Sequence, residues 1–349
     1  MKLSKIIGPQ PSGLTYTGKD FKSSGTVKWC PGCGDYAILN SLQKAMAELG
    51  IAPHDTVVVS GIGCSSRLPY YMNTYGMHTI HGRGAAIATG VKVANPDLSV
   101  WLVSGDGDSM AIGGNHFIHM IRRNVDINMM LINNKIYGLT KGQYSPTSDR
   151  GFVTKSSPMG TVEDPFIPAD LVFGARGTFF ARTIDVDMQL TQNILVQAAR
   201  HKGASIVEGL VNCMIFNNGT HKQYTDREKR ADATIILRHG ERMIYGKERN
   251  KGLVLDGLEL KSVTIGENGV TEEDILVHDA TAKSSVLHSM LGMMHVVNPG
   301  LPVALGVIRS VEAPTYDQEV TDQVISAQEK QPGLTLQDHL NSLSSWEVK

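Results

Sequence analysis

The sequence lacks several features that would assign it to a particular class of protein. Its 33 lysines and arginines balance 34 aspartates and glutamates, so the clustered excess of positive charge typical of a nucleic-acid-binding surface is missing. No stretch approaches the roughly 18 uninterrupted apolar residues of a membrane span. The start, MKLSKIIGPQPSG, lacks the apolar core and cleavage site of a secretory signal. These absences predict a soluble, cytoplasmic protein that binds neither nucleic acid nor membranes.

Cysteine is also scarce, with four residues among 349. Structural disulfides are rare in the cytoplasm, so cysteines there more often bind metal or take part in chemistry. Cys30 and Cys33 form a CPGC turn that can direct two thiolates at one metal centre, whereas Cys64 and Cys213 follow apolar segments. Four thiolates suffice for a tetrahedral zinc or for a [4Fe–4S] cluster. The spacing alone leaves both open, together with a redox-active CxxC pair and two buried core cysteines.

What the chain does contain is enough apolar material for a core, since 41% of its residues are hydrophobic and only 19% charged. Short apolar runs predict buried strands at 56–60, 99–105, 126–133 and 204–212. Segments between them have helical spacing, at 36–49, 84–94 and 113–123. Strand–helix alternation of this kind predicts an α/β fold, with a mostly parallel sheet and helices on both faces.

The composition divides the chain into three parts. Residues 1–28 are polar and rich in Gly, Ser and Thr, and we expect them to form an N-terminal arm. Residues 29–225 carry the strand–helix alternation and form the predicted main domain. From residue 226 the chain becomes charged and turn-rich, so residues 226–349 are expected to form a C-terminal extension. We expect a small, β-rich, peripheral layer to about residue 275 and a polar tail from residue 315.

The strongest motif is an apolar strand that runs directly into Gly105-Asp106-Gly107, with a second apolar strand that ends in Asn133-Asn134. Glycines let the backbone close on a diphosphate. An aspartate and an asparagine at neighbouring strand ends supply the hard oxygen ligands that Mg²⁺ prefers. The two segments together therefore predict a magnesium–diphosphate site.

Taken together, these motifs resemble the β subunit of 2-oxoacid:ferredoxin oxidoreductases over roughly residues 15–230. The matching segments occur in the same order: WCPGCGDY (29–36), GIGCSSR (61–67), HGRGAAIATGVKVANP (81–96), GDG (105–107), GNHFIHMIRRN (114–124) and NNKIYGLTKGQYSPTS (133–148). The GNHFIHMIRRN and SPTS stretches and the extra C-terminal segment look closer to the 2-oxoglutarate branch than to the pyruvate branch.

The resemblance implies a thiamine diphosphate-binding fold and a set of site residues. Asp106, Asn134 and the carbonyl of Ile136 would bind Mg²⁺. The four cysteines would hold one [4Fe–4S] cluster close to the thiamine. Further cofactor contacts are implied at Gly63, Ser65, His81, Gly105 and Gly107.

Three side chains are candidates for substrate binding or catalysis. Arg67 could bind the substrate carboxylate, and Lys141 could bind the second carboxylate of 2-oxoglutarate or face solvent. His81 could hydrogen-bond the thiamine or the substrate.

The reaction implied by the resemblance converts 2-oxoglutarate and coenzyme A to succinyl-CoA and CO₂ with electron transfer to ferredoxin, or runs in reverse. One cluster uses all four cysteines and the ferredoxin-like CxxCxxCxxxCP run is absent, so electrons would leave directly to an external acceptor or a partner subunit. Only the diphosphate-binding half of a thiamine enzyme is recognisable. We therefore expect an α subunit that supplies the pyrimidine-binding half and its activating glutamate, in a heterodimer or a dimer of heterodimers.

Three alternatives stay open at this point. The first is the same chemistry on pyruvate or another 2-oxoacid. The second is a non-redox thiamine-dependent lyase or carboligase whose cysteines bind zinc. The third is a non-catalytic scaffold subunit that binds zinc.

Overall fold

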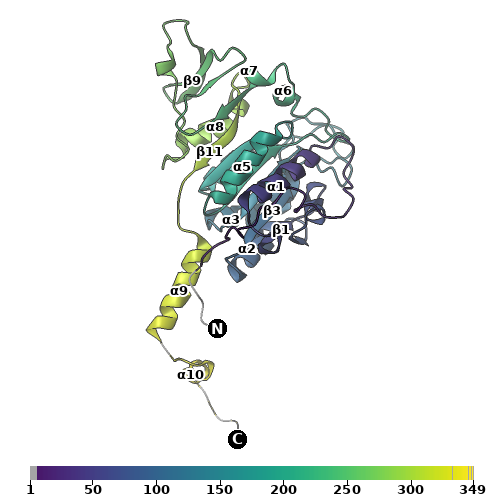
Figure 1. Cartoon of the computed structure of the whole chain (residues 1–349). Helices are drawn as coiled ribbons and strands as arrows, with labels where there is room; N and C mark the ends of the chain where they lie inside the picture. Colours follow the sequence, from purple (N-terminus) through teal and green to yellow (C-terminus); the bar gives the residue numbers. More distant parts are fainter. Residues whose placement is uncertain (1–5, 332, 345, 347, 349) are drawn as a thin grey trace.

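The computed structural model describes residues 6–331, 333–344, 346 and 348 (Figure 1). Their main feature is an eight-stranded sheet with the order β2-β1-β3-β4-β6-β5-β11-β7. Its strands are β1 (Thr56–Ser60), β2 (Tyr75–His78), β3 (Ser99–Gly105), β4 (Asn128–Asn133), β5 (Phe179–Ile184), β6 (Ser205–Leu210), β7 (Thr234–Leu237) and β11 (Val303–Ser310). The first six are parallel, β11 is antiparallel to β5, and β7 is parallel to β11. The four strands predicted from the sequence are present as β1, β3, β4 and β6.

Helices cover both faces of this sheet. On one face α1 and α5 lie side by side, as Figure 1 shows, and share a core with the strands. The opposite face is covered by α2, α3, α4 and α8. The bounds of these helices are α1 (Asp35–Leu49), α2 (Gly84–Ala94), α3 (Gly114–Arg122), α4 (Pro168–Gly174), α5 (Met188–Arg200) and α8 (Val286–Val297). The predicted α/β class and the three predicted helices are confirmed.

The central strands have two buried faces because helices lie on both sides. In β3, Trp101 and Val103 pack into the core with α1 and α5, whereas Val100 and Leu102 pack into the opposite core. Successive side chains of a strand point to opposite faces, so a strand buried on both sides reads as a continuous apolar run. This is why the runs in the sequence predicted these strands well.

The parallel arrangement brings four sequence motifs to one edge of the sheet. The loop after β1 carries Cys64, β3 leads into Asp106, β4 leads into Asn134, and β6 is followed by Cys213. Ligands of open α/β sheets bind at the carboxyl ends of the strands. The fold thus places the predicted magnesium and cysteine motifs at the same edge.

The structure departs from the predicted boundary at residue 225. β7 and β11 complete the large sheet and α8 packs on its face, so much of the segment expected to be peripheral belongs to the main fold. The physical reason is the outer edge of β5, whose backbone groups pair with β11. A small β-rich layer is present as a separate antiparallel sheet of β8 (Ile244–Tyr245), β9 (Lys251–Asp256) and β10 (Glu259–Thr264).

The remaining helices are short or lie at the C-terminal end of the chain. They are α6 (Lys222–Thr225), α7 (Arg230–Ala233), α9 (Tyr316–Lys330) and α10 (Leu336–Asn341), with short 3₁₀ or π segments at η1 (Pro53–Asp55), η2 (Ser65–Tyr71), η3 (Asp108–Ile112) and η4 (Glu272–Asp274). α9 leads away from the sheet toward α10 (Figure 1). Among the helices of the described residues, none combines the length and the apolar character needed to cross a bilayer.

Candidate functional site

A cavity lies where the loops after β1, β3 and β4 meet. Its lining residues are Ile62, Gly63, Cys64, Ser65, His81, Gly105, Asp106, Gly107, Asp108, Asn134, Ile136, Tyr137, Gly138, Leu139 and Thr140. Every residue expected to contact thiamine diphosphate or magnesium is in this set, and so is one of the four cysteines. The structure therefore brings together motifs that are up to 77 residues apart in the sequence, from Gly63 to Thr140.

Asp106 is fully buried, and its two carboxylate oxygens have different surroundings. Its Oδ2 accepts a hydrogen bond from Ser145 Oγ at 2.6 Å and another from Thr147 Oγ1. Burial raises the pKa of Asp106, and the two hydroxyls oppose that rise. Within the described residues Oδ1 has no side-chain hydrogen-bond donor, so one carboxylate oxygen is left for a ligand in the cavity.

The turn after β4 is held in place by side chains from two other loops. Ser148 Oγ donates to the carbonyl of Lys135 at 2.7 Å, and Asn217 Nδ2 donates to the carbonyl of Asn134 at 3.0 Å. Lys135 itself has φ +54°, in the left-handed region. The amide of Ile136 donates to Asn134 Oδ1 at 3.2 Å. These bonds fix a tight turn whose residues Asn134 and Ile136 line the same cavity as Asp106.

Two glycines shape the cavity wall. A Cβ atom at Gly107 would overlap the ring of Tyr137, whose hydroxyl donates to the Gly107 carbonyl at 2.8 Å. Gly63 has φ +140°, and a Cβ built there would meet open space. A glycine is thus required at position 107 because Tyr137 packs closely against it. At position 63 a glycine is favoured because the backbone has a positive φ, and its missing side chain leaves open space.

His81 is oriented by an aspartate that the sequence motif did not single out. Its Nδ1 lies 2.5 Å from Oδ1 of Asp108, which also accepts a hydrogen bond from the Gly82 amide at 2.7 Å. Ser104 Oγ donates to the other oxygen of Asp108. Asp108 is buried, whereas the His81 side chain is 40% exposed and lines the cavity. The aspartate therefore turns the Nε2 side of the imidazole away from the protein interior.

The cysteines gather next to this cavity. Gly34, which directly follows the CPGC turn, donates its amide hydrogen to the carbonyl of Asn212 and so places the turn beside Cys213. A Cβ at Gly138 would lie 3.5 Å from Cys64 Sγ and 3.6 Å from Cys213 Sγ, so the missing side chain leaves a space between two thiols. Cys30 is exposed and the other three cysteines are half-buried.

The thiols also affect one another electrostatically. The pKa of Cys33 is raised, first by burial and then by Asp35, with Cys213 and Cys64 adding to the effect. Burial raises the pKa of Cys64 to about 11, and Asp35, Cys213 and Cys30 contribute in the same direction. Among the described residues, no three His, Cys, Asp or Glu side chains converge closely enough to hold a single metal ion.

Comparison with known proteins identifies the family. The family model for the thiamine pyrophosphate enzyme C-terminal TPP binding domain matches residues 61–209. The 2-oxoglutarate oxidoreductase subunit KorB of Mycobacterium tuberculosis is 44% identical over 348 residues, which are 99% of this chain and 92% of that protein. The β subunit of 2-oxoacid:ferredoxin oxidoreductase 1 of Aeropyrum pernix is 48% identical over 200 residues, 57% of this chain and 63% of that protein. The chain belongs to the family of 2-oxoacid:ferredoxin oxidoreductase β subunits.

A solved structure of the same family has the same fold. The 2-oxoglutarate:ferredoxin oxidoreductase from Magnetococcus marinus, with 2-oxoglutarate, coenzyme A and succinyl-CoA bound, matches with a TM-score of 0.76 at 31% identity. The match covers 97% of this chain and 99% of that chain. The thiamine diphosphate-binding fold expected from the resemblance is thus confirmed.

Two residues expected to contact substrate in this family member lie outside the cavity lining. Arg67 is half-buried in η2, close enough to Cys64 to lower the pKa of that thiol. Lys141 is exposed and has φ +76°, in the loop that begins at Gly138. The structure therefore does not bring these two cations together with the magnesium motif, and their roles stay predictions.

Several side chains around the site were missed by sequence reasoning. Asp108 directly follows the GDG motif, and Ser145 and Thr147 lie in the SPTS stretch that had been noted only as a feature of the family. Their proximity to His81 and Asp106 depends on how loops 27 to 41 residues apart fold together. A search for hydroxyl residues near the NN motif could have found Ser145 and Thr147.

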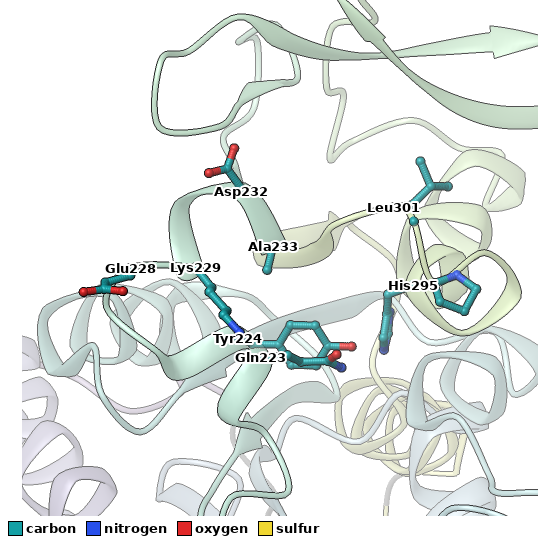
Figure 2. Close-up of a pocket in the computed structure, with 10 residues that line it drawn as sticks. Gln223, Tyr224, Glu228, Lys229, Asp232, Ala233, His295 and Leu301 are labelled. Carbon is teal, nitrogen blue, oxygen red and sulfur yellow. The ribbon is translucent and has the colours of Figure 1, made fainter.

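A second hollow lies on the C-terminal side of the molecule. Figure 2 shows Lys229 pointing toward Tyr224, with His295 of α8 nearby. The charged segment 226–233 contributes Glu228, Lys229 and Asp232 to it. None of its lining residues lines the cavity that contains Asp106.

Proposed function

We propose that this chain is the β subunit of an oxidoreductase that converts 2-oxoglutarate and coenzyme A to succinyl-CoA and CO₂, with ferredoxin as electron acceptor. In this proposal the chain binds the diphosphate of thiamine diphosphate through Mg²⁺ and holds one [4Fe–4S] cluster. The same chemistry can run in reverse and fix CO₂. The main support for this proposal is that Cys64, a proposed cluster ligand, and Asp106, a proposed magnesium ligand, line the same cavity.

The donor atoms fit a magnesium ion and a diphosphate. Asp106 offers one free carboxylate oxygen, and Asn134 and Ile136 offer an amide and a carbonyl oxygen in a turn fixed by other loops. These are the hard ligands that Mg²⁺ binds. Gly63 and Gly105 leave room for the diphosphate to approach the backbone, whereas Gly107 lets Tyr137 pack against the chain. When bound, thiamine diphosphate supplies the electron sink for the carbon–carbon bond that breaks as CO₂ leaves.

His81 would donate or accept a proton during this reaction. Its Nδ1 is held by the Asp108 carboxylate, so Nε2 is the nitrogen available to the cavity. A fixed tautomer and orientation are what a histidine needs to give or take a proton at a defined atom. We assign His81 this role, with Asp108 as its positioning residue.

The thiols fit a cluster better than a single zinc ion. Zinc requires its ligands within about 2.3 Å of one point, whereas a cubane distributes four thiolates over four irons. The cysteines lie close enough to raise one another's pKa, but no three of the described ligand-type residues converge on one ion. The absent side chain of Gly138 leaves space beside Cys64 Sγ and Cys213 Sγ, and we expect the cluster there.

An α subunit would cover the open side of the cavity. Large apolar side chains are exposed around His81, on the edge strand β2 and the adjoining loops, namely Tyr70, Tyr75, Met77, Ile80 and Ile112. A patch of this kind marks a protein interface. It supports a partner that completes the site with the pyrimidine-binding half and its activating glutamate.

The relatives from Mycobacterium tuberculosis and Magnetococcus marinus support 2-oxoglutarate as the substrate. A dicarboxylate requires two cations, and our candidates are Arg67 for the first carboxylate and Lys141 for the second. Assays of the purified αβ complex with 2-oxoglutarate, pyruvate and a branched 2-oxoacid test this assignment. A kcat/KM at least about tenfold higher for 2-oxoglutarate is expected, and equal values for pyruvate would contradict it.

Two substitutions test whether the cofactor sites are separate. Asp106→Ala should abolish retention of thiamine diphosphate while leaving the iron content largely intact, because the ion that bridges the diphosphate loses a ligand. Cys213→Ser should lose the cluster and keep the thiamine. Asp97→Ala is the control, because the Asp97 carboxylate accepts hydrogen bonds from the amides of Ile7 and Gly8 in the N-terminal arm and does not line the cavity. Loss of both cofactors in both variants would contradict two separate sites.

A further inference from the structure

A buried ion pair stands in the middle of the large sheet. Arg182 on β5 and Glu208 on β6 are opposite each other in the register, and Arg182 Nε donates to Glu208 Oε2 at 2.7 Å. Their side chains are 1% and 2% exposed. Burying two charges costs a large desolvation free energy that their attraction offsets only in part, so such a pair is weak evidence for a role in stability. Its other contacts indicate what it does.

On one side the pair is tied to the C-terminal part of the chain. Arg182 Nη2 donates to the carbonyl of Gly292 in α8 at 2.9 Å, and Nη1 donates to the carbonyl of Ala304 in β11 at 3.4 Å. The charge of Arg182 also acts on Tyr224 and His295, which line the hollow of Figure 2. The guanidinium thus joins β5 to elements that follow residue 225.

On the other side the pair reaches the magnesium motif. Asn133 Nδ2 donates to Glu208 Oε1 at 2.8 Å. Asn133 Oδ1 lies 3.1 Å from Thr147 Oγ1, and Thr147 Oγ1 in turn bonds Asp106 Oδ2. All of these residues are buried. A continuous path of polar contacts therefore runs from α8 and β11 to the carboxylate of Asp106.

The direction of these bonds follows from the donors available. An ionised Glu208 can only accept, so Asn133 must turn its NH₂ group toward Glu208 and its oxygen toward Thr147. The Thr147 hydroxyl has one hydrogen and faces the acceptors Asn133 Oδ1 and Asp106 Oδ2, and Ser145 Oγ also lies 3.1 Å from it. When Asn133 turns its oxygen toward Thr147, Asn133 and Asp106 compete for the Thr147 hydrogen. When Asn133 turns its NH₂ group toward Thr147, Asp106 no longer has this competitor. A carboxylate that shares a donor keeps more negative charge for a metal ion than one that has the donor to itself.

We propose that Glu208, Asn133 and Arg182 are positioning residues that set the affinity of Asp106 for the magnesium ion of the cofactor. This inference rests on the proposed function, because it requires the metal at Asp106. It gives the C-terminal elements α8 and β11 a part in cofactor binding, through the carbonyls that hold Arg182.

The test uses Glu208→Gln in the purified αβ complex. Glutamine keeps an oxygen for Arg182 and turns an NH₂ group toward Asn133, which must then reverse and donate to Thr147. The Thr147 hydrogen goes wholly to Asp106, and Arg182 keeps an uncompensated positive charge. Both changes weaken cation binding. We expect about tenfold weaker Mn²⁺ binding by electron paramagnetic resonance, the lower end of the roughly 10–100-fold range for outer-shell partners.

A second variant and a control separate this role from folding. Asn133→Ala also leaves the Thr147 hydrogen to Asp106, so it should weaken Mn²⁺ binding even if Glu208→Gln does not fold. Arg309→Lys is the control, because this buried arginine on β11 donates to the carbonyls of Gly177, Ala282 and Lys283 and lies 2.9 Å from His288 Nδ1, and among the described residues no side-chain hydrogen bond links it to Arg182, Glu208 or Asn133. It should lower the thermal midpoint and leave Mn²⁺ affinity unchanged.

The outcomes distinguish this inference from the proposed function. If the wild-type complex binds Mn²⁺ and thiamine diphosphate but Glu208→Gln and Asn133→Ala both stay within about twofold of it, the positioning role is wrong and the function stands. The positioning role is also wrong if Arg309→Lys weakens Mn²⁺ binding as much as Glu208→Gln does. If the wild-type complex binds no thiamine diphosphate, the proposed function and this inference both fall.

Discussion

At the scale of single residues, the site depends on two buried carboxylates, Asp106 and Asp108, which are held by hydrogen-bond donors. Asp108 accepts hydrogen bonds from the Gly82 amide and the Ser104 hydroxyl and lies against the His81 ring. Asp106 divides its two oxygens between hydroxyl donors and the cavity. Buried carboxylates are tolerated only when donors satisfy them, so these residues are held rigidly. Rigid placement is what the chemistry at a metal–diphosphate site requires.

The role of His81 gives a prediction at this scale. Asp108→Asn replaces an acceptor with an NH₂ group, so the imidazole loses its fixed tautomer. The kcat of the complex should fall by about 10²-fold, the lower end for a general acid–base group. Thiamine diphosphate affinity should change by less than about threefold, because Asp108 is not among the proposed magnesium ligands. Asp149→Asn is the control, since that carboxylate pairs with Lys135 at 67% exposure. Unchanged kcat in Asp108→Asn would remove His81 from the mechanism.

The residues that could be predicted from the sequence are those whose chemistry is local. Glycines and an aspartate at the end of one apolar strand, together with an asparagine pair at the end of the next, indicate a magnesium–diphosphate site. Thr147 and Asp108 could not be assigned in this way, because their partners come from other loops. Thr147 meets Asp106 only after the chain has folded back over 41 residues.

At the scale of helices and strands, prediction found the central strands β1, β3, β4 and β6, although Glu208 interrupts the apolar run of β6. β3 and β4 were identified with nearly correct bounds. β5 was missed, and it carries the charged Arg182 in the middle of FFARTI. The arginine is buried only because Glu208 lies opposite it on β6. The positions of β7 and β11 depend on the free edge of β5 and leave no local pattern.

Two buried histidines give a prediction for acid stability at the scale of elements. Burial lowers the pKa of His201, at the end of α5, to about 4, and that of His221, beside β4, to about 4. The ordinary value is 6.5. Between pH 6.5 and about 4 the unfolded chain binds more protons than the folded chain, so stability falls as the pH falls. Each histidine can contribute up to about 3 kcal/mol of this loss.

The measurement is the thermal midpoint as a function of pH. His221→Gln should flatten its decline between pH 6.5 and about 4, since one of the buried histidines no longer titrates. His54→Gln is the control, because the His54 side chain is 75% exposed. An identical decline in wild type and His221→Gln would show that His221 does not remain neutral in the fold.

At the scale of the whole molecule, the site is open on one side. The loops of a parallel sheet converge on Asp106 and the cysteines, but the edge strand β2 exposes Tyr75 and Met77 beside the cavity. An apolar edge strand invites pairing or burial by another chain. From the sequence we predicted that a partner subunit supplies the pyrimidine-binding half. The exposed apolar patch around β2 supports that prediction and indicates where the partner would bind.

The patch can be tested by substitution. Ile80→Asp, next to His81, should prevent co-purification with the α subunit and reduce activity in proportion, because a buried unpaired charge at an interface is strongly unfavourable. Ile80 is 76% exposed in the chain alone, so the substitution should not unfold it. Leu258→Asp is the control, because Leu258 is 91% exposed at the turn between β9 and β10. Normal assembly of Ile80→Asp would place the interface elsewhere.

The most direct test of the whole account is the iron, acid-labile sulfide and zinc content of the complex purified without oxygen. The account predicts about four irons and a matching amount of sulfide per β chain, held by Cys30, Cys33, Cys64 and Cys213. Cys213→Ser should lose this iron, which assigns it to the β chain. One zinc per chain without sulfide would contradict electron transfer through this subunit and leave a thiamine enzyme with a different reaction.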